Sequence, residues 1–259
     1  MNVIAIIPAR YGSSRFEGKP LADILGKPMI QWVYEGVTQS KLIKKVMVAT
    51  DDQRIMEAVQ NFGGNAVITS PDHPSGTDRV AEVARKLKAE VIVNVQGDEP
   101  LIKGSIIDKA IRPLRADETL PMSTLVTPID EVKDWLNPHI VKVVLDQKCF
   151  ALYFSRSPIP FPRDLNIDRL ESHPFGTKRA LPKKIFKHIG VYVYRRDFLL
   201  RFSKMKPTPL EKLEKLEQLR ALENGYRIKA SIVDYEPICV DTPGDLQKVV
   251  TFLSSSYLK

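Results

Sequence analysis

Short apolar runs alternate with amphipathic stretches through the first hundred residues of the chain. The runs predict four strands, at 3–7, 46–50, 66–69 and 91–95. Helices are expected after the first three of them, at 30–40, 54–62 and 77–86. Consecutive apolar strands separated by helices are typical of a parallel sheet that is covered on both faces. In such sheets ligands bind at the carboxyl ends of the strands, so the residues that follow each strand are candidates for a site.

The second half of the chain has a different pattern. Strands are predicted at 122–127, 140–145, 150–154, 188–194, 228–233 and 238–240, with a terminal helix at 246–253. A leucine at every third position predicts one helix over 210–224, closed by Gly225. Leucines at this spacing move around the helix surface, so we expect the helix to be buried on more than one side, as at a subunit interface. The segment 157–187 is rich in proline and charge and is expected to be an extended loop.

The composition is that of an ordinary soluble globular protein, with 43% hydrophobic and 27% charged residues. No apolar stretch is long enough to span a bilayer, and the first apolar run ends at Pro8 without the features of a signal peptide. Cys149 and Cys239 have no metal-type spacing and are expected to be reduced core residues, which favours a cytoplasmic protein. The net charge of +8 suggests an anionic partner, either a nucleic acid or a nucleotide with an acidic small molecule.

The residues after the first predicted strand carry the strongest chemical signal. Segment 7–20 reads IPARYGSSRFEGKP, in which Gly12 and Ser13 allow backbone N–H groups to face an anion. Arg10, Arg15 and Lys19 add three cations within ten residues. The segment matches neither the dinucleotide-binding fingerprint nor the P-loop. It therefore predicts a different kind of phosphate-binding loop, with a basic surface turn as the alternative.

Two carboxylates follow later predicted strands. Asp98 lies in NVQGDEP after the fourth strand, and Asp241 lies in VDTPGD just before a helix. Thr242 is expected to cap that helix, with Pro243 as its first residue and Asp245 as its third. Carboxylate oxygens suit Mg²⁺, which phosphoryl and nucleotidyl transfer require. The alternatives are that Asp98 caps a turn or helix and that Asp241 is an ordinary loop residue.

Four further segments contain polar side chains that have a structural and a functional interpretation. SGTDR at 75–79 is either a capped helix start or part of a nucleotide pocket. An arginine at a strand end, Arg156, suits a sugar carboxylate. His188 and Tyr192 lie four apart, on one face of a strand, where a histidine is commonly a core residue. Glu217 and Gln218 form a polar pair on a predicted helix, where such a pair is commonly solvated.

Together these segments resemble the sugar nucleotidyltransferases, most closely the CMP-Kdo synthetases (3-deoxy-manno-octulosonate cytidylyltransferases), over nearly the whole chain. The loop at 7–20 and QGDEP at 96–100 carry the resemblance. It implies an α/β, Rossmann-like nucleotide-diphospho-sugar transferase fold, with a largely parallel central sheet and a smaller subdomain for dimerisation and acceptor binding. We expect a single domain over 1–259, with a nucleotide-binding half at 1–127, an acceptor-binding and dimerisation part at 128–235, and a return to the core at 236–259. A homodimer is also implied.

The resemblance also implies a role for each candidate residue. Mg²⁺ is expected on Asp98 and Asp241, and catalysis is expected from Arg10, Arg15, Lys19 and Asp98. The nucleotide, CTP, is expected to contact Pro8, Ala9, Arg10, Gly12, Ser13, Arg15, Lys19, Ser75, Gly76, Arg79 and Asp98. The acidic sugar is expected to contact Gln96, Arg156, His188, Tyr192, Glu217 and Gln218. One departure from the family is Glu17, where the family commonly has proline. A carboxylate at this position weakens the attraction of the loop for phosphate unless it points outward.

The implied reaction is attack of the 2-hydroxyl of Kdo on the α-phosphorus of CTP, with pyrophosphate as the leaving group. A second Mg²⁺ shared by the two aspartates would lower the pKa of the hydroxyl, so that no protein base is required. CMP-sialate synthetase and activation of 8-amino-Kdo are the nearest alternatives. A nucleic-acid-binding protein is the alternative from another class, and it would show a stripe of cations with steeply salt-dependent binding.

Overall fold

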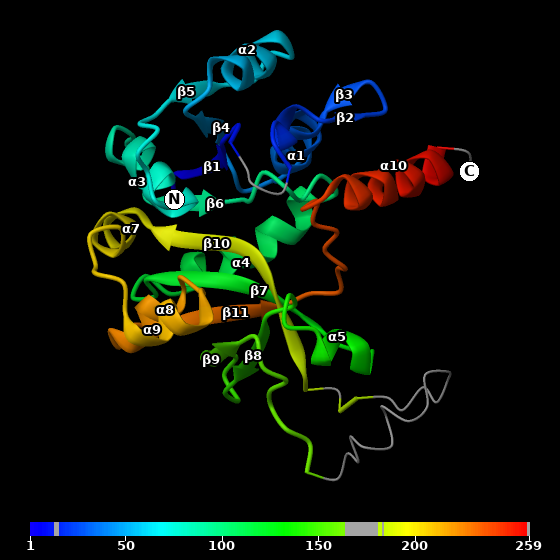
Figure 1. Cartoon of the computed structure of the whole chain (residues 1–259). Coiled ribbons are helices and arrows are strands. Elements are labelled where there is room, and N and C mark those ends of the chain that lie inside the picture. Colours follow the sequence, from blue (N-terminus) through cyan, green and yellow to red (C-terminus); the bar gives the residue numbers. More distant parts are fainter. Residues whose placement is uncertain (13–15, 164–180, 183, 258–259) are drawn as a thin grey trace. The chain divides into compact units, whose positions relative to one another are not determined.

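The structure is a computed structural model that describes residues 1–12, 16–163, 181–182 and 184–257 (Figure 1). The chain divides into two compact units. The first contains 1–123, 190–205 and 235–259, and the second contains 124–189 and 206–234. The segment 190–205 therefore belongs with the first unit, whereas the predicted acceptor-binding part runs without interruption from 128 to 235.

The first unit is built on a largely parallel sheet. Its strands lie in the order β10 (Phe186–Arg195, from Gly190 onward), β6 (Val91–Asn94), β1 (Val3–Ala9), β4 (Lys45–Thr50) and β5 (Ala66–Ile68). The strands β6, β1, β4 and β5 run parallel to one another, and β10 runs antiparallel to β6. The predicted parallel sheet is confirmed, with strand bounds that differ from the predicted ones by at most two residues. Its central strands are buried on both faces, which explains why they read as unbroken apolar runs.

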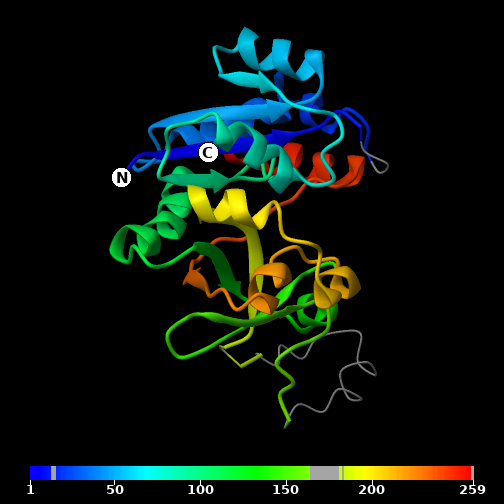
Figure 2. The ribbon, with the colours of Figure 1, turned by 90° about the vertical axis from the view of Figure 1, so that its left-hand side faces the viewer.

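Helices cover both faces of this sheet. On opposite sides of β1 lie α1 (Met29–Thr38) and α3 (Gly76–Arg85), as Figures 1 and 2 show. The sequence also predicted α2 (Gln53–Asn61) and α10 (Pro243–Tyr257), the second of which is longer than expected. It did not predict α4 (Gly104–Ala116), α7 (Arg196–Phe202), the 3₁₀ turn η1 (Lys19–Leu21) or the hairpin of β2 (Asp23–Ile24) and β3 (Lys27–Pro28).

The second unit contains shorter elements. They are β7 (Met122–Pro128, from Thr124 onward), α5 (Val132–Leu136), β8 (Lys142–Leu145), β9 (Ala151–Ser155), α8 (Pro209–Glu214), α9 (Leu219–Glu223) and β11 (Ile228–Ile232). A hairpin joins β8 to β9, and β11 pairs with β7. The turn between these strands begins at Asp146, whose Oδ1 accepts hydrogen bonds from the N–H groups of Lys148 and Phe150, each at 2.8 Å.

The single helix predicted over 210–224 is wrong. The chain leaves helical geometry at Lys215, where φ is +55°, so that α8 and α9 are separate. A buried ion pair explains the break, because Arg220 Nη2 lies 2.5 Å from Glu211 Oε1. Nine residues of continuous helix would hold these two side chains roughly 13 Å apart along the axis. Within one chain Leu216 and Leu219 are buried, whereas Leu213 is 80% exposed, so the expected burial at a subunit interface stays a prediction.

Two smaller expectations are also wrong. Residues 238–240 form no strand, and this segment is instead tied down by the hydrogen bond from Val240 N to Asp98 O. Neither cysteine is a core residue, because Cys149 lies half-buried in the β8–β9 turn and Cys239 is exposed. Among the described residues, no helix is long and apolar enough to cross a membrane.

Two glycines allow backbone segments of the first unit to approach closely. A Cβ at Gly104, the first residue of α4, would lie 2.1 Å from Ser40 N and 2.4 Å from the carbonyl carbon of Gln39. A Cβ at Gly36 in α1 would lie 2.2 Å from Ile102 O. Backbone atoms cannot move aside as the end of a flexible side chain can, so these contacts fix how α1 and α4 pack.

We therefore predict that Gly104→Ala lowers the free energy of unfolding by about 2 kcal/mol, because the added methyl forces the backbone at 39–40 to shift. Urea denaturation measures this change. Gly244→Ala is the matched control, since its Cβ would meet nothing nearer than Thr242 Oγ1 at 3.7 Å. Equal stability of the two variants would show that the helices are not held by this contact.

Candidate active site

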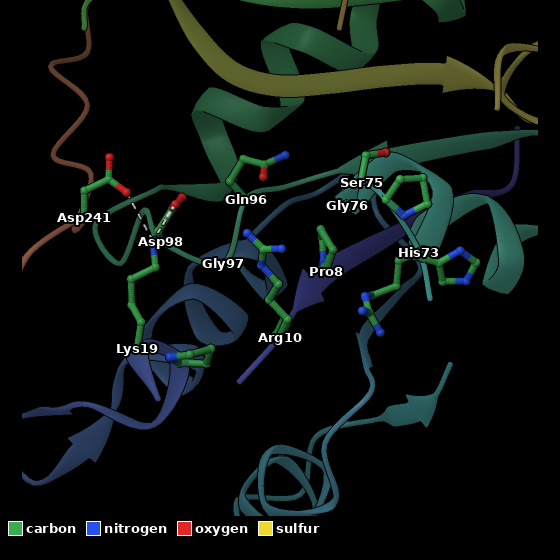
Figure 3. A pocket seen from close by; sticks show the side chains of 14 residues that line it. Pro8, Arg10, Lys19, His73, Ser75, Gly76, Gln96, Gly97, Asp98 and Asp241 are labelled. Carbon is green, nitrogen blue, oxygen red and sulfur yellow. Dashed lines mark hydrogen bonds and ion pairs between the residues drawn. The ribbon is translucent and has the colours of Figure 1, made fainter. Parts of the chain in front are cut away.

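A cavity of about 260 Å³ opens at the carboxyl ends of the parallel strands of the first unit (Figure 3). Its walls come from the segments that follow β1, β5 and β6 and from the segment that precedes α10. The lining residues are Pro8, Ala9, Arg10, Lys19, Pro20, His73, Pro74, Ser75, Gly76, Arg79, Gln96, Gly97, Asp98 and Asp241. The sequence predicted a site at this edge, and ten of its candidate residues meet there.

The ammonium of Lys19 lies between two carboxylates in this cavity. Its Nζ is 2.9 Å from Asp98 Oδ2 and 3.4 Å from Asp241 Oδ1 (Figure 3). The hydrogen bond from Val240 N to Asp98 O, at 2.9 Å, holds the backbone of the two aspartates side by side. Residues from three distant parts of the chain therefore form one charged cluster.

The predicted helix cap positions Asp241. α10 begins at Pro243, and Thr242 Oγ1 accepts a hydrogen bond from Asp245 N at 3.3 Å. In return Asp245 Oδ2 accepts from Thr242 N at 3.1 Å, which completes a reciprocal cap. The cap places Asp241 immediately before the helix and beside the end of the sheet.

The two carboxylates suit a hard divalent cation. Both already lie within reach of a single cationic nitrogen, so a metal ion between them would replace one positive charge with another. Within the described part of the chain, no group of three or more His, Cys, Asp or Glu side chains is placed to hold a metal. Mg²⁺ commonly uses one or two protein carboxylates and completes its shell with water and substrate phosphates, so the donor set fits it.

The neighbouring carboxyl group, Glu99, was not identified from the sequence. Glu99 is only 3% exposed. Burial, and secondarily the charge of Asp98, raise the pKa of Glu99 to about 8. Glu99 is therefore largely protonated at neutral pH, and the negative charge at the site is carried by Asp98 and Asp241.

The candidates for the nucleotide pocket on α3 have structural roles as well. Ser75 is the N-cap of α3 and accepts a hydrogen bond from Asp78 N at 3.2 Å. The buried guanidinium of Arg79 donates to Asp51 Oδ2 at 2.7 Å and to Thr69 Oγ1 at 2.5 Å, which ties together the ends of β4 and β5. The SGTDR segment is therefore a capped helix start whose residues also line the cavity, and its nucleotide-binding role stays a prediction.

Some loop candidates are not among the residues that line the cavity. Gly12 is exposed, and Ser13 and Arg15 lie outside the described residues. His73 lines the cavity but was not predicted, and its Nε2 lies 2.6 Å from Glu82 Oε2. Its only signal in the sequence was its place between the third strand and the SGTDR segment.

The acceptor candidates are divided between the two units. In the first unit Gln96 lines the cavity and donates to Asn94 Oδ1 at 3.2 Å, and Tyr192 pairs with Asn94 across β10 and β6. In the second unit Glu217 Oε1 lies 3.9 Å from Arg220 Nη2, and Gln218 is buried.

Arg156, at the end of β9, is held by Glu214, the last residue of α8. Its Nε donates to the Glu214 backbone oxygen at 2.8 Å, and its Nη1 donates to Pro138 O at 3.0 Å. The Glu214 carboxylate accepts from Arg156 N at 2.9 Å. The two carbonyl contacts orient the plane of the guanidinium without neutralising its charge, so Arg156 can still bind an anion.

His188 lies on β10 within the second unit. Its Nε2 is 2.8 Å from Thr124 Oγ1, and its ring contacts Phe154 edge-on with centroids 5.2 Å apart. Burial lowers the pKa of His188 to about 3. The ring is therefore neutral at physiological pH and can exchange hydrogen bonds but not carry charge.

Comparisons with known proteins agree with this geometry. The cytidylyltransferase family model matches residues 4–229. The 3-deoxy-manno-octulosonate cytidylyltransferase of Geotalea uraniireducens is 58% identical over 250 residues, which cover 96% of this chain and 98% of the relative. The protein of the same name from Geobacter metallireducens is 56% identical over 254 residues, which cover 98% of each.

Solved structures give the same result. A CMP:2-keto-3-deoxy-manno-octonic acid synthetase complexed with CTP has a TM-score of 0.89 and 43% identity, and the match covers 99% of this chain and 100% of that one. A cytidylyltransferase from Leptospira borgpetersenii, at 15% identity and a TM-score of 0.63, shares the fold. The chain belongs to the cytidylyltransferase family, in its 3-deoxy-manno-octulosonate branch.

Proposed function

We propose that this chain transfers CMP from CTP to the 2-hydroxyl of Kdo and releases pyrophosphate, which activates the sugar for lipopolysaccharide biosynthesis. The observation that carries the proposal is the cavity at the strand ends in which Lys19 joins Asp98 and Asp241. The names of the relatives and the CTP complex of the similar structure support the substrates.

Arg10 and Lys19 are the cations that the cavity offers to a triphosphate. Both lie in its wall, on either side of the loop that follows β1. An arginine can grip two phosphate oxygens, whereas a lysine acts as a point charge that follows the group it neutralises. As negative charge builds on the leaving pyrophosphate, fixed cations at this position lower the barrier without reorganising.

Asp98 and Asp241 are the residues that would hold Mg²⁺. When bound there, the metal ion supplies charge neutralisation at the transferred phosphoryl group and favours deprotonation of the attacking hydroxyl. Lys19 holds the same two carboxylates together before a metal ion is present, which keeps two like charges from separating. The protonated state of Glu99 prevents a third charge from accumulating beside them.

Arg156 and His188 are proposed to bind the acidic sugar. The oriented guanidinium of Arg156 matches a sugar carboxylate, and the neutral His188 suits a sugar hydroxyl. Gln96, Tyr192, Glu217 and Gln218 are proposed as further acceptor contacts because they occupy family positions at which the sugar binds.

Pyrophosphate release with a panel of substrates tests the proposed function. CTP with Kdo should give the highest kcat/KM, above CTP with 8-amino-Kdo or a sialic acid and above UTP with any of these sugars. A preference for 8-amino-Kdo or sialic acid would move the chain to a different acceptor. Tight, salt-sensitive binding of RNA without turnover would contradict the proposed enzyme altogether.

A homodimer in the cytoplasm is part of the proposal. Leu210 and Leu213 on α8 are 36% and 80% exposed, and apolar side chains in such positions are suited to contact a second copy of the chain. Sedimentation equilibrium tests this, since a homodimer has twice the chain mass of 29.3 kDa. Sedimentation at the mass of one chain at all concentrations would contradict it.

Asp98→Asn should lower kcat by on the order of 10³-fold while leaving the fold intact, because the amide keeps the shape but loses the charge that binds the metal ion. Steady-state assays across a range of Mg²⁺ concentrations measure this effect. Asp197→Asn is the matched control, because that side chain is 88% exposed and is not among the residues that line the cavity. Near-normal turnover by Asp98→Asn would refute the metal assignment.

The low pKa of His188 leads to a prediction about pH. Because the ring is already neutral above about pH 5, replacing it should cost the same activity at every pH. The ratio of kcat/KM for Kdo between His188→Gln and the unmodified protein should thus stay constant from about pH 6 to 8. His139→Gln, at an exposed position, is the control. A step in the ratio near the ordinary histidine pKa would show that His188 titrates during catalysis.

A further inference from the structure

The two cations of the cavity wall flank a loop whose ends are closed by one hydrogen bond. Gly18 N donates to Tyr11 O at 2.9 Å, so the loop leaves β1 after Arg10 and returns to the cavity at Lys19. Gly18 has a φ of +67°, and a Cβ there would lie 3.1 Å from the ring of Tyr11. The Tyr11 ring thus packs directly on the backbone that leads into Lys19.

A side chain from α2 lies over the same ring. The guanidinium carbon of Arg54 is 3.3 Å from the centroid of Tyr11, within the range of a close cation–π contact. Gly18 and Arg54 are both in contact with Tyr11, although they come from different elements of the first unit. No local pattern in the sequence predicts this contact, because the tyrosine and the arginine are 43 positions apart along the chain.

The start of α2 holds Arg54 in place. Arg54 Nε and Nη2 donate to the two carboxylate oxygens of Asp52 at 2.9 and 2.6 Å. Asp52 is also the N-cap of α2 and accepts from Arg54 N at 2.9 Å. A guanidinium that is held by a fork of two hydrogen bonds loses little further freedom when it stacks on a ring.

Glu17 places an unusual charge in the loop. Glu17 lies next to Gly18 and is exposed, where the family commonly has proline. The pKa of Arg54 is raised, first by its hydrogen bonds to Asp52 and to a smaller extent by the charge of Glu17. Glu17 therefore attracts Arg54 only weakly, and Asp52 is the main partner of Arg54.

We propose that Arg54 is a positioning residue for the phosphate-binding loop, which holds the Tyr11 ring against Gly18 so that Arg10 and Lys19 remain directed into the cavity. The proposal rests on the proposed function, because it takes the cavity to be the site of the triphosphate. A role confined to the helix would instead be limited to Asp52 and the stability of α2.

Calorimetric titration of CTP in the absence of sugar tests this inference separately from turnover. Arg54→Ala should weaken CTP binding about tenfold. The KM for Kdo should remain unchanged, because the acceptor residues are not altered, whereas kcat should also fall, because Arg10 and Lys19 stabilise the leaving pyrophosphate. Tyr11→Leu should give the same loss, and the double variant should be little worse than either, since both changes remove one contact.

Two further variants separate positioning from helix stability. Arg54→Lys should recover part of the affinity, because it keeps a cation over the ring. Glu17→Gln should have little effect on CTP affinity, since Glu17 attracts Arg54 only weakly. A purely structural role of Arg54 in α2 does not predict the recovery by Arg54→Lys. Lys45→Ala, which removes an exposed cation at the amino end of β4, is the control for net charge.

The results distinguish the two proposals. If the unmodified protein does not bind CTP, the proposed function fails. If it binds CTP and Arg54→Ala binds equally well, the positioning role of Arg54 is overturned. Thermal melting of each variant shows whether a loss of binding reflects unfolding, and a folded Tyr11→Leu with unchanged CTP affinity would also overturn the inference.

Discussion

The sheet and the loops of the first unit together bring Lys19 into contact with Asp98 and Asp241. Two carboxylates that face one cavity repel each other, and the ammonium between them removes most of that cost. The parallel strands bring the end of β1 beside the end of β6, and the bond from Val240 to Asp98 adds the segment before α10. Without the sheet these charges would be spread over more than two hundred residues of the chain.

Under the proposed function, the same cluster would let one cavity serve both a metal ion and a triphosphate. Lys19 balances the carboxylates in the free protein, and it would become available to phosphate once a divalent cation bound Asp98 and Asp241. Burial raises the pKa of Glu99 to about 8, so this carboxyl group adds little negative charge beside the two aspartates at neutral pH. Gly18, which precedes Lys19, packs against Tyr11, and Arg54 stacks on the same ring, so the backbone that leads into Lys19 has contacts beyond the two ion pairs.

The sequence was most informative where structure is local. Unbroken apolar strands, the residues after them and the Thr242 cap could all be predicted, because periodicity and capping act over a few residues. It was least informative where distant residues decide. The buried pair of Glu211 and Arg220 divides the predicted helix, and the pKa of Glu99 depends on burial that no local pattern reveals. The stacking of Arg54 on Tyr11 is of the same kind.

Binding of Mn²⁺, an EPR-visible substitute for Mg²⁺, tests the central role of Lys19 most directly. In the absence of nucleotide the metal ion has to displace the ammonium from both carboxylates. Lys19→Met should therefore bind Mn²⁺ at least about tenfold more tightly than the unmodified protein, because the competing charge is removed. Equal or weaker binding of Mn²⁺ by Lys19→Met would show that Lys19 does not occupy the place of the metal ion and would contradict this account of the site.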